Sequence, residues 1–211
     1  LLGAYITKKG ENIDLINRNK AHVEALKDDG AHIVGTVDFT QEVNAFTPDE
    51  MSGKYDIIFL LTKQQENDRV VTFLKDYLAD GGVIVTLQNG LPEEGIADIL
   101  GAERVLGCTV AWGATMLGPG LVELTSAPDS LTFSLGSISA PAHPLLPEVK
   151  RVLELMGPVT VEPNFVGTRW SKLLINSAFS GMSAVLGCTF GEASADKNSR
   201  GIVLSLIKEC I

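Results

Sequence analysis

The chain has 211 residues, of which 45% are hydrophobic and 20% are charged, and its formal net charge is −9. This composition is typical of a folded globular protein and excludes a wholly disordered chain. The acidic balance argues against nucleic-acid and membrane-surface partners, whereas a small anionic ligand needs only a local positive pocket.

The cysteines and the two ends of the sequence add further expectations. Cys108, Cys188 and Cys210 are odd in number and lack metal-ligand spacing, which predicts reduced thiols, no metal site and a cytoplasmic protein. No apolar run approaches the roughly 20 residues of a membrane span. The sequence begins and ends inside helical patterns, at Leu1 and Ile211, so we expect both termini to be truncated.

The first half of the sequence alternates helices and strands. The strongest signal is YDIIFLL at residues 55–61, a continuous apolar run typical of a parallel strand that is covered on both faces. We expect helices at about 1–9, 20–29 and 70–78, and strands at about 12–17, 32–34, 41–46, 55–61 and 83–87. Such alternation predicts an α/β fold with a doubly wound parallel sheet.

The pattern changes after residue 100. Strand signals at about 104–111, 121–125 and 131–136 are separated by Gly and Pro turns without helices, which predicts an antiparallel extension of the sheet. A helix at about 144–156 and a strand at 159–161 follow, and every later signal is helical. We therefore expect a boundary near Pro163, with a dinucleotide-binding domain over residues 1–163 and the start of a helical domain over 164–211.

The stretch FVGTRWSKLLINSAFSGMSAVLG, residues 165–187, carries Lys172, Asn176 and Ser180 at successive intervals of four. This spacing places the three polar side chains on one face of a helix. Apolar residues cover much of the remaining circumference, so we expect the helix to be buried on several sides. Lys172 either extends its charged end to water or presents a catalytic ammonium to a cleft.

Polar residues follow three of the predicted strands, at the edge of the sheet where α/β proteins bind ligands. Arg18 follows the strand at 12–17, where an Arg suits the 2′-phosphate of NADP and an acidic residue suits NAD. Lys63 follows the strand at 55–61, within reach of the adenosine or phosphate side of a dinucleotide. Asn89 follows the strand at 83–87 and precedes Gly90, a pair that is first a turn signal. A solvated loop charge is the alternative interpretation of both Arg18 and Lys63.

Other catalytic patterns are missing from the sequence. The glycine-rich phosphate loop of a dinucleotide-binding domain would precede the first helix, and Gly3 lies too far along that helix to belong to it. His22, His32 and His143 have neither metal-ligand spacing nor an obvious carboxylate partner. These observations favour neither a metal site nor a hydrolase triad.

Several segments in order, LLGAYITKKG, INRNK, FLLTK, LQNGL, GPG and WSKLLINSAFSGMSAVLG, resemble the 2-dehydropantoate 2-reductase, or ketopantoate reductase, family. The resemblance covers essentially the whole chain, and the Lys-xxx-Asn pair that follows a Trp, downstream of Asn-Gly, is a fairly specific part of it. It implies a Rossmann-like domain followed by a helical domain, with the active site between them. The implied activity is the NADPH-dependent reduction of 2-dehydropantoate to pantoate, in the pathway to pantothenate and coenzyme A.

The resemblance also implies roles for single residues. Lys172 is similar to the catalytic lysine, which acts as the general acid, and Asn176 is similar to its substrate-binding partner. Asn89 resembles the amide that contacts cofactor and substrate, while Arg18 and Lys63 resemble the cofactor-binding cations.

One position departs from the family pattern. The family often has a second Asn one turn beyond the first, where this sequence has Ser180 as the candidate substrate contact. Substrate identity is therefore less constrained than reaction class, and a reductase of another branched 2-oxo acid is an alternative. A non-catalytic dinucleotide-binding regulator is a second alternative, and the apolar helical domain leaves room for a homodimer.

Overall fold

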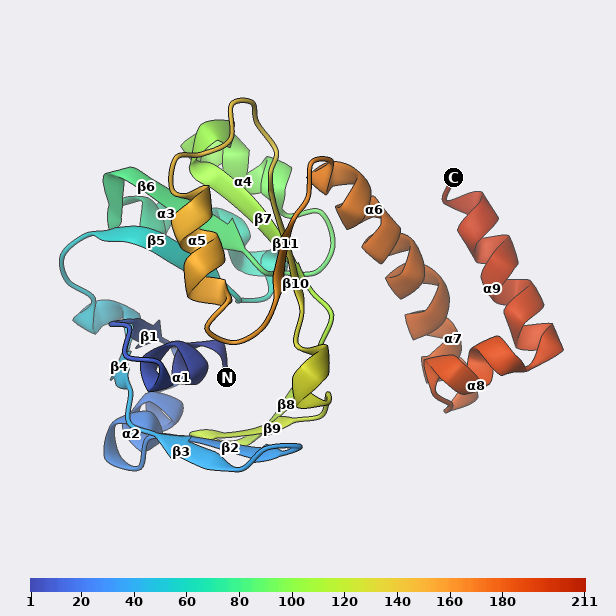
Figure 1. Cartoon of the computed structure of the whole chain (residues 1–211), viewed down its shortest axis with the longest axis horizontal. Coiled ribbons are helices and arrows are strands. Elements are labelled where there is room, and N and C mark those ends of the chain that lie inside the picture. Colours follow the sequence, from blue (N-terminus) through green and yellow to red (C-terminus); the bar gives the residue numbers. More distant parts are fainter.

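A computed structural model describes residues 1–211 as a three-layered α/β domain followed by a helical arm (Figure 1). The central sheet has five strands in the order β11-β10-β7-β6-β5, and β5, β6 and β7 are parallel. The strands are β1 Asp14–Ile16, β2 Ala31–Gly35, β3 Phe39–Gln41, β4 Asn44–Phe46, β5 Tyr55–Leu60, β6 Leu78–Thr86, β7 Val105–Val110, β8 Ala114–Gly118, β9 Leu121–Leu124, β10 Phe133–Ser137 and β11 Val159–Val161. The helices are α1 Leu2–Lys8, α2 Lys20–Asp28, α3 Asn67–Lys75, α4 Glu93–Leu100, α5 Leu146–Leu153, α6 Phe165–Ile175, α7 Gly181–Leu186, α8 Phe190–Ala195 and α9 Lys197–Glu209.

Strand β6 forms the centre of the core because both of its faces are covered. Its side chains alternate: Val83 and Val85 join the cluster that contains α5, whereas Ile84 joins the cluster that contains α3 and α4. This alternation follows from the two-residue period of a strand. The continuously buried run at 83–87 is thus explained by helices on both faces of a parallel sheet, as the sequence predicts.

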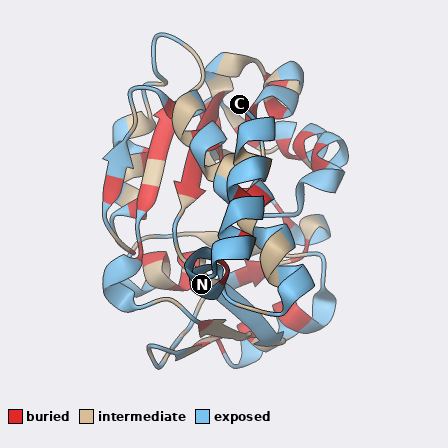
Figure 2. Ribbon diagram, turned by 90° about the vertical axis from the view of Figure 1, so that its right-hand side faces the viewer, coloured by how far each residue is buried: buried red, intermediate tan, exposed pale blue.

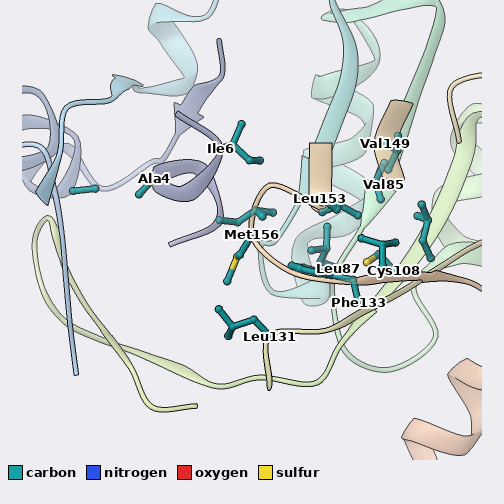
Figure 3. Close-up of a cluster of buried hydrophobic side chains, with 14 of the residues drawn as sticks. Ala4, Ile6, Val85, Leu87, Cys108, Leu131, Phe133, Val149, Leu153 and Met156 are labelled. Carbon is teal, nitrogen blue, oxygen red and sulfur yellow. The ribbon is translucent and has the colours of Figure 1, made fainter. Parts of the chain in front are cut away.

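The larger core cluster extends from the central sheet to α1 (Figure 3). Ala4 and Ile6 of α1 are fully buried in the same cluster as Leu131 and Phe133, which lie just before and within β10. Helix α1 therefore belongs to the core of the domain.

The remaining strands form two smaller sheets. β1 pairs in parallel with β4, and the other sheet has the order β3-β2-β9-β8. The hydroxyl of Tyr55, at the start of β5, donates to the Asp14 carboxylate at the start of β1 over 2.9 Å. This bond links the small sheet of β1 and β4 to the central sheet.

The structure confirms the predicted fold class and corrects several element boundaries. The segment predicted as one strand at 41–46 forms β3 and β4, which belong to different sheets. The helix predicted at 70–78 ends at Lys75, and the paired glycines at 81 and 82 lie inside β6 instead of terminating a helix. Pairing with β5 begins as early as Leu78, which pairs with Tyr55, so sheet formation overrides the glycine signal. Strand β8 and helix α4 were not predicted.

The C-terminal arm runs from α6 through α9 and extends away from the sheet (Figure 1). Much of its surface is exposed (Figure 2), including Ile175 at 52% and Val185 at 83%. The prediction that the helix at 165–187 is buried on several sides is therefore wrong for this chain. No helix combines the length and apolar character needed to cross a membrane.

Candidate active site

Helix α6 docks on the domain through its first residue, Phe165. The Phe165 side chain is buried against Gly107 of β7 and Gly136 of β10, and a Cβ added at either glycine would overlap it. Two glycines on neighbouring strands thus leave the space that an aromatic ring fills. The Asn164 side chain accepts from the Gly167 amide over 3.0 Å and caps the helix at this point.

One helical turn further on, Arg169 is buried among backbone carbonyls at the ends of β6 and β7. Its Nη1 donates to the Gln88 carbonyl over 2.8 Å, and its Nη2 approaches the Thr86 and Cys108 carbonyls at 3.4 Å each. Its Nε also donates to Oε1 of Glu93, the first residue of α4, over 3.0 Å. Arg169 therefore connects α6 to both strand ends and to α4.

Lys172 lies on the same face, three residues after Arg169. Its ammonium donates to the backbone carbonyl of Val110, the last residue of β7, over 2.6 Å. The side chain is half-buried and forms no ion pair. An ammonium has three N–H donors, so the contact with Val110 orients the group and leaves donors for a ligand.

The electrostatic surroundings of Lys172 favour loss of its proton. Burial lowers the pKa of Lys172 below its ordinary range, and the positive charge of Arg169 lowers it further, while Cys108 acts in the opposite direction. Burial also raises the pKa of the Cys108 thiol to about 12. Cys108 is therefore a neutral thiol at neutral pH, and Lys172 is the more readily titrated group of the two.

A buried amide network shapes the edge of the sheet beside these cations. Gln88 and Asn67 exchange two hydrogen bonds of 2.8 and 3.0 Å, and Gln88 also donates to the Thr62 carbonyl over 2.7 Å. These bonds join the end of β6 to the loop that follows β5. The adjacent Asn89 keeps its side chain exposed, while its carbonyl accepts from Gln64 over 2.8 Å.

Asn176 and Ser180 lie further along the same helix, at the two ends of a π-helical turn over Asn176–Ser180. Residues four apart drift by about 40° around a regular α-helix, and the wider π turn offsets this drift. The π turn therefore keeps Ser180 close to the face of Lys172, although neither Asn176 nor Ser180 makes a side-chain hydrogen bond. Such turns are frequent at functional sites.

Arg18 and Lys63 are exposed just after β1 and β5. Neither forms an ion pair. Because β5 and β6 are parallel neighbours, Lys63 and Asn89 lie at the same edge of the central sheet. The structure thus places Lys63 and Asn89 at a single edge, whereas Arg18 follows a strand of another sheet. It shows no hydrogen bond between any of these three residues and Lys172.

Sequence reasoning missed Arg169 and Glu93. Phe165, Arg169, Lys172 and Asn176 follow the spacing i, i+4, i+7 and i+11, which marks one helix face. An Arg one turn after Phe165 on that face was the available signal for a buried charge. Its partner could not be predicted, since Glu93 lies 76 residues earlier in the chain.

Family comparisons cover both parts of the chain. Residues 1–137 match the family model described as ketopantoate reductase PanE/ApbA, and residues 164–211 match the model of its C-terminal part.

Individual relatives agree with these matches. A 2-dehydropantoate 2-reductase of Pyrococcus horikoshii is 30% identical over 210 residues, which cover 99% of this chain and 67% of the relative. The 2-dehydropantoate 2-reductase of Streptococcus pyogenes serotype M1 is 24% identical over 210 residues, which cover 99% of this chain and 68% of the relative.

Solved structures have the same fold. The 2-dehydropantoate 2-reductase of Geobacter metallireducens superposes with a TM-score of 0.88 at 26% identity, covering 99% of this chain and 69% of that one. A D-mandelate dehydrogenase solved with NADH and anilino(oxo)acetate has a TM-score of 0.85 at 17% identity. The match covers 99% of this chain and 74% of the dehydrogenase chain. This second likeness concerns the fold alone.

Proposed function

Because the chain belongs to the ketopantoate reductase PanE/ApbA family, we propose that it contributes the active site for reduction of 2-dehydropantoate to pantoate. The observation that carries this proposal is the Lys172 ammonium, which is held at the end of β7 without a carboxylate partner. An ammonium that is not neutralised in the protein is available to a carboxylate or a ketone oxygen of a substrate.

The proposed reaction uses Lys172 as general acid. Reduced nicotinamide, when bound, supplies a hydride to the ketone carbon. Negative charge then develops on the ketone oxygen, where the Lys172 Nζ stabilises it and transfers a proton. The lowered pKa of Lys172 assists this transfer, because an acid works best when its pKa is near the working pH.

The amides are assigned to orientation. Asn176 lies four residues after Lys172 on the same helix face, and we assign it to the substrate together with Ser180. Asn89, with its side chain free at the end of β6, is assigned to the alignment of cofactor and ketone. Correct placement of the reacting groups lowers the barrier without further chemistry.

The cofactor is proposed to be NADP. Arg18 and Lys63 are exposed, unpaired cations at the carboxyl ends of parallel strands, a donor set that fits an anionic nucleotide. Arg18 supports the 2′-phosphate, because its planar guanidinium binds phosphate oxygens in pairs. The domain assignment follows from this: residues 1–163 bind the cofactor, and residues 164–211 begin the substrate domain.

The test is an assay of reduced-nicotinamide oxidation with 2-dehydropantoate and a panel of other branched 2-oxo acids, each with NADPH and with NADH. The proposal requires 2-dehydropantoate with NADPH to give the highest kcat/KM. A higher kcat/KM for another 2-oxo acid would change the assigned substrate but leave the proposed reaction class unchanged. Binding of NADPH without turnover of any 2-oxo acid would identify a dinucleotide-binding regulator.

A further inference from the structure

The ion pair of Arg169 and Glu93 differs from every other ion pair in the structure. Its two side chains are 2% and 5% exposed, whereas the remaining pairs join side chains that are 36% to 68% exposed. Burial of two charges is costly unless each is paired and hydrogen-bonded. The reaction described above uses neither residue, so this buried pair requires another explanation.

The hydrogen-bond partners of Arg169 belong to the sheet and to α4. Three are backbone carbonyls, of Thr86, Gln88 and Cys108, and the fourth is the Glu93 carboxylate at the start of α4. Backbone carbonyls in and just after a buried sheet move little. A carboxylate is also favourable in the first turn of a helix. The guanidinium is thus held in one position by groups from two strands and a helix.

This arrangement requires the shape of an Arg. A guanidinium presents five N–H donors in one plane, which meet a carboxylate and several carbonyls at once. A Lys has three donors on a single nitrogen and cannot make this planar fork. The Phe165 ring, 5.3 Å from the guanidinium carbon, covers the group further.

Arg169 also determines how α6 lies along β7. The Cys108 and Val110 carbonyls are two residues apart on β7, and they accept from Arg169 and Lys172, which are three residues apart on α6. Two residues on one face of the helix therefore meet two carbonyls on the same side of the strand. A shift of α6 along β7 would break both contacts and carry the Lys172 ammonium away from the strand end.

We propose that Arg169 is a positioning residue, whose buried pair with Glu93 fixes α6 on the ends of β6 and β7 and so holds the Lys172 ammonium at the Val110 carbonyl. The catalytic consequence of this inference rests on the proposed function, whereas the positioning itself does not. The charge of Arg169 has a second effect on Lys172, since it opposes the positive form of that neighbour. The other titratable groups that lie beside Arg169 and Lys172 are Cys108 on β7 and Glu93 on α4.

The experiment compares Arg169→Lys, which keeps the charge, with Arg169→Met, which removes it. Arg151→Met is the matched control, because Arg151 lies on α5 and pairs with exposed carboxylates. Kinetics give kcat, KM and the alkaline limb of the pH profile for each variant. Independently, trace acylation of lysines across a range of pH, read by peptide mass spectrometry, gives the titration of Lys172 without any substrate.

We expect both Arg169 variants to lose about 10²-fold in kcat, the effect of a small misplacement of a catalytic group, with a smaller change in KM. Arg169→Met should also move the titration of Lys172 to higher pH, whereas Arg169→Lys should leave it closer to wild type. Arg151→Met should change neither. A folded Arg169→Met variant with wild-type kcat and wild-type Lys172 titration would overturn the inference.

Two further comparisons keep the outcome interpretable. If Arg169→Met does not fold, the double variant Arg169→Met/Glu93→Gln removes both buried charges and is measured instead, with the same expectation for Lys172. If the wild-type protein reduces no 2-oxo acid, the proposed function fails, and the acylation experiment alone decides the positioning, through the reactivity of the deprotonated Lys172 amine. This reactivity should rise in both Arg169 variants once the amine is released from the Val110 carbonyl. In that case an unchanged reactivity of Lys172 in both variants contradicts the positioning.

Discussion

Lys172 donates a 2.6 Å hydrogen bond from its ammonium to the carbonyl of Val110, and this contact joins the helical arm to the last residue of a central strand. No carboxylate neutralises the ammonium. A lysine that only extends its charge into water would not need an acceptor at a strand end. The contact therefore favours the catalytic interpretation of Lys172 over the solvated one.

The first prediction concerns pH. The protonated form of Lys172 is the proton donor. The reduction rate is therefore maximal below the pKa of Lys172 and falls as the pH rises through this pKa. Burial and Arg169 place this pKa below the ordinary value of 10.5, and the loss should begin at correspondingly lower pH. The measurement is kcat for ketone reduction across the alkaline range. A rate that stays constant up to the ordinary lysine range would contradict the assignment of Lys172 as the acid.

The second prediction concerns cofactor choice. Arg18→Asp should weaken NADPH binding by about tenfold or more, because loss of a charge-assisted contact with phosphate removes roughly 1.5–3 kcal/mol. NADH, which lacks the 2′-phosphate, should be affected much less. Titration of both nucleotides by fluorescence measures the difference, with Arg200→Asp, an exposed change on α9, as the control. Equal losses of affinity for NADPH and NADH would show that Arg18 does not bind the 2′-phosphate.

The third prediction concerns the docking of α6. Gly136→Ala should destabilise the protein by about 1–3 kcal/mol, because the added methyl group overpacks the site of Phe165. Gly181→Ala is the matched control: it lies in a helix, and an added Cβ meets nothing within 4 Å. That control should be neutral or stabilising by up to about 1 kcal/mol. Denaturant unfolding measures both variants, and equal stability of the two would show that Phe165 does not fill a fixed space.

The fourth prediction concerns the buried ion pair. Glu93→Leu alone should cost about 3–5 kcal/mol, because it leaves the Arg169 charge buried without its partner. Glu93→Leu/Arg169→Met should recover much of this loss, since apolar replacement of a whole buried pair is often neutral. The comparison is a double-mutant cycle of unfolding free energies. Additive losses in the double variant would mean that the two side chains do not act as a pair.

Local patterns made much of the α/β domain predictable from the sequence. The largely apolar runs at 55–61 and 83–87 predict parallel strands of the main sheet, because both faces of such a sheet are covered. The pairing of β2 with β9 could not be predicted, since nothing in 31–35 indicates a partner about 90 residues away. The glycines at 81 and 82 were misread for a related reason: a strand partner, rather than local propensity, decides their structure.

In the candidate site too, features set by local sequence could be predicted, whereas contacts between distant residues could not. Lys172, Asn176 and Ser180 could be proposed as candidates because they lie on one helix face, and spacing within a helix is visible in the sequence. Glu93 was not found, because its role depends on a contact across 76 residues. The exposure of the helix was also missed, since apolar composition gives no information on which neighbours cover each face.

The central claim is that Lys172 supplies the proton and stabilises the developing charge in 2-oxo acid reduction. The most direct measurement is the turnover of 2-dehydropantoate with NADPH by Lys172→Ala, beside unfolding and NADPH-binding measurements on the same preparation. We predict that kcat falls by about 10²–10⁴-fold while the fold and nucleotide binding persist. A folded Lys172→Ala protein that retains nearly wild-type kcat would contradict the account.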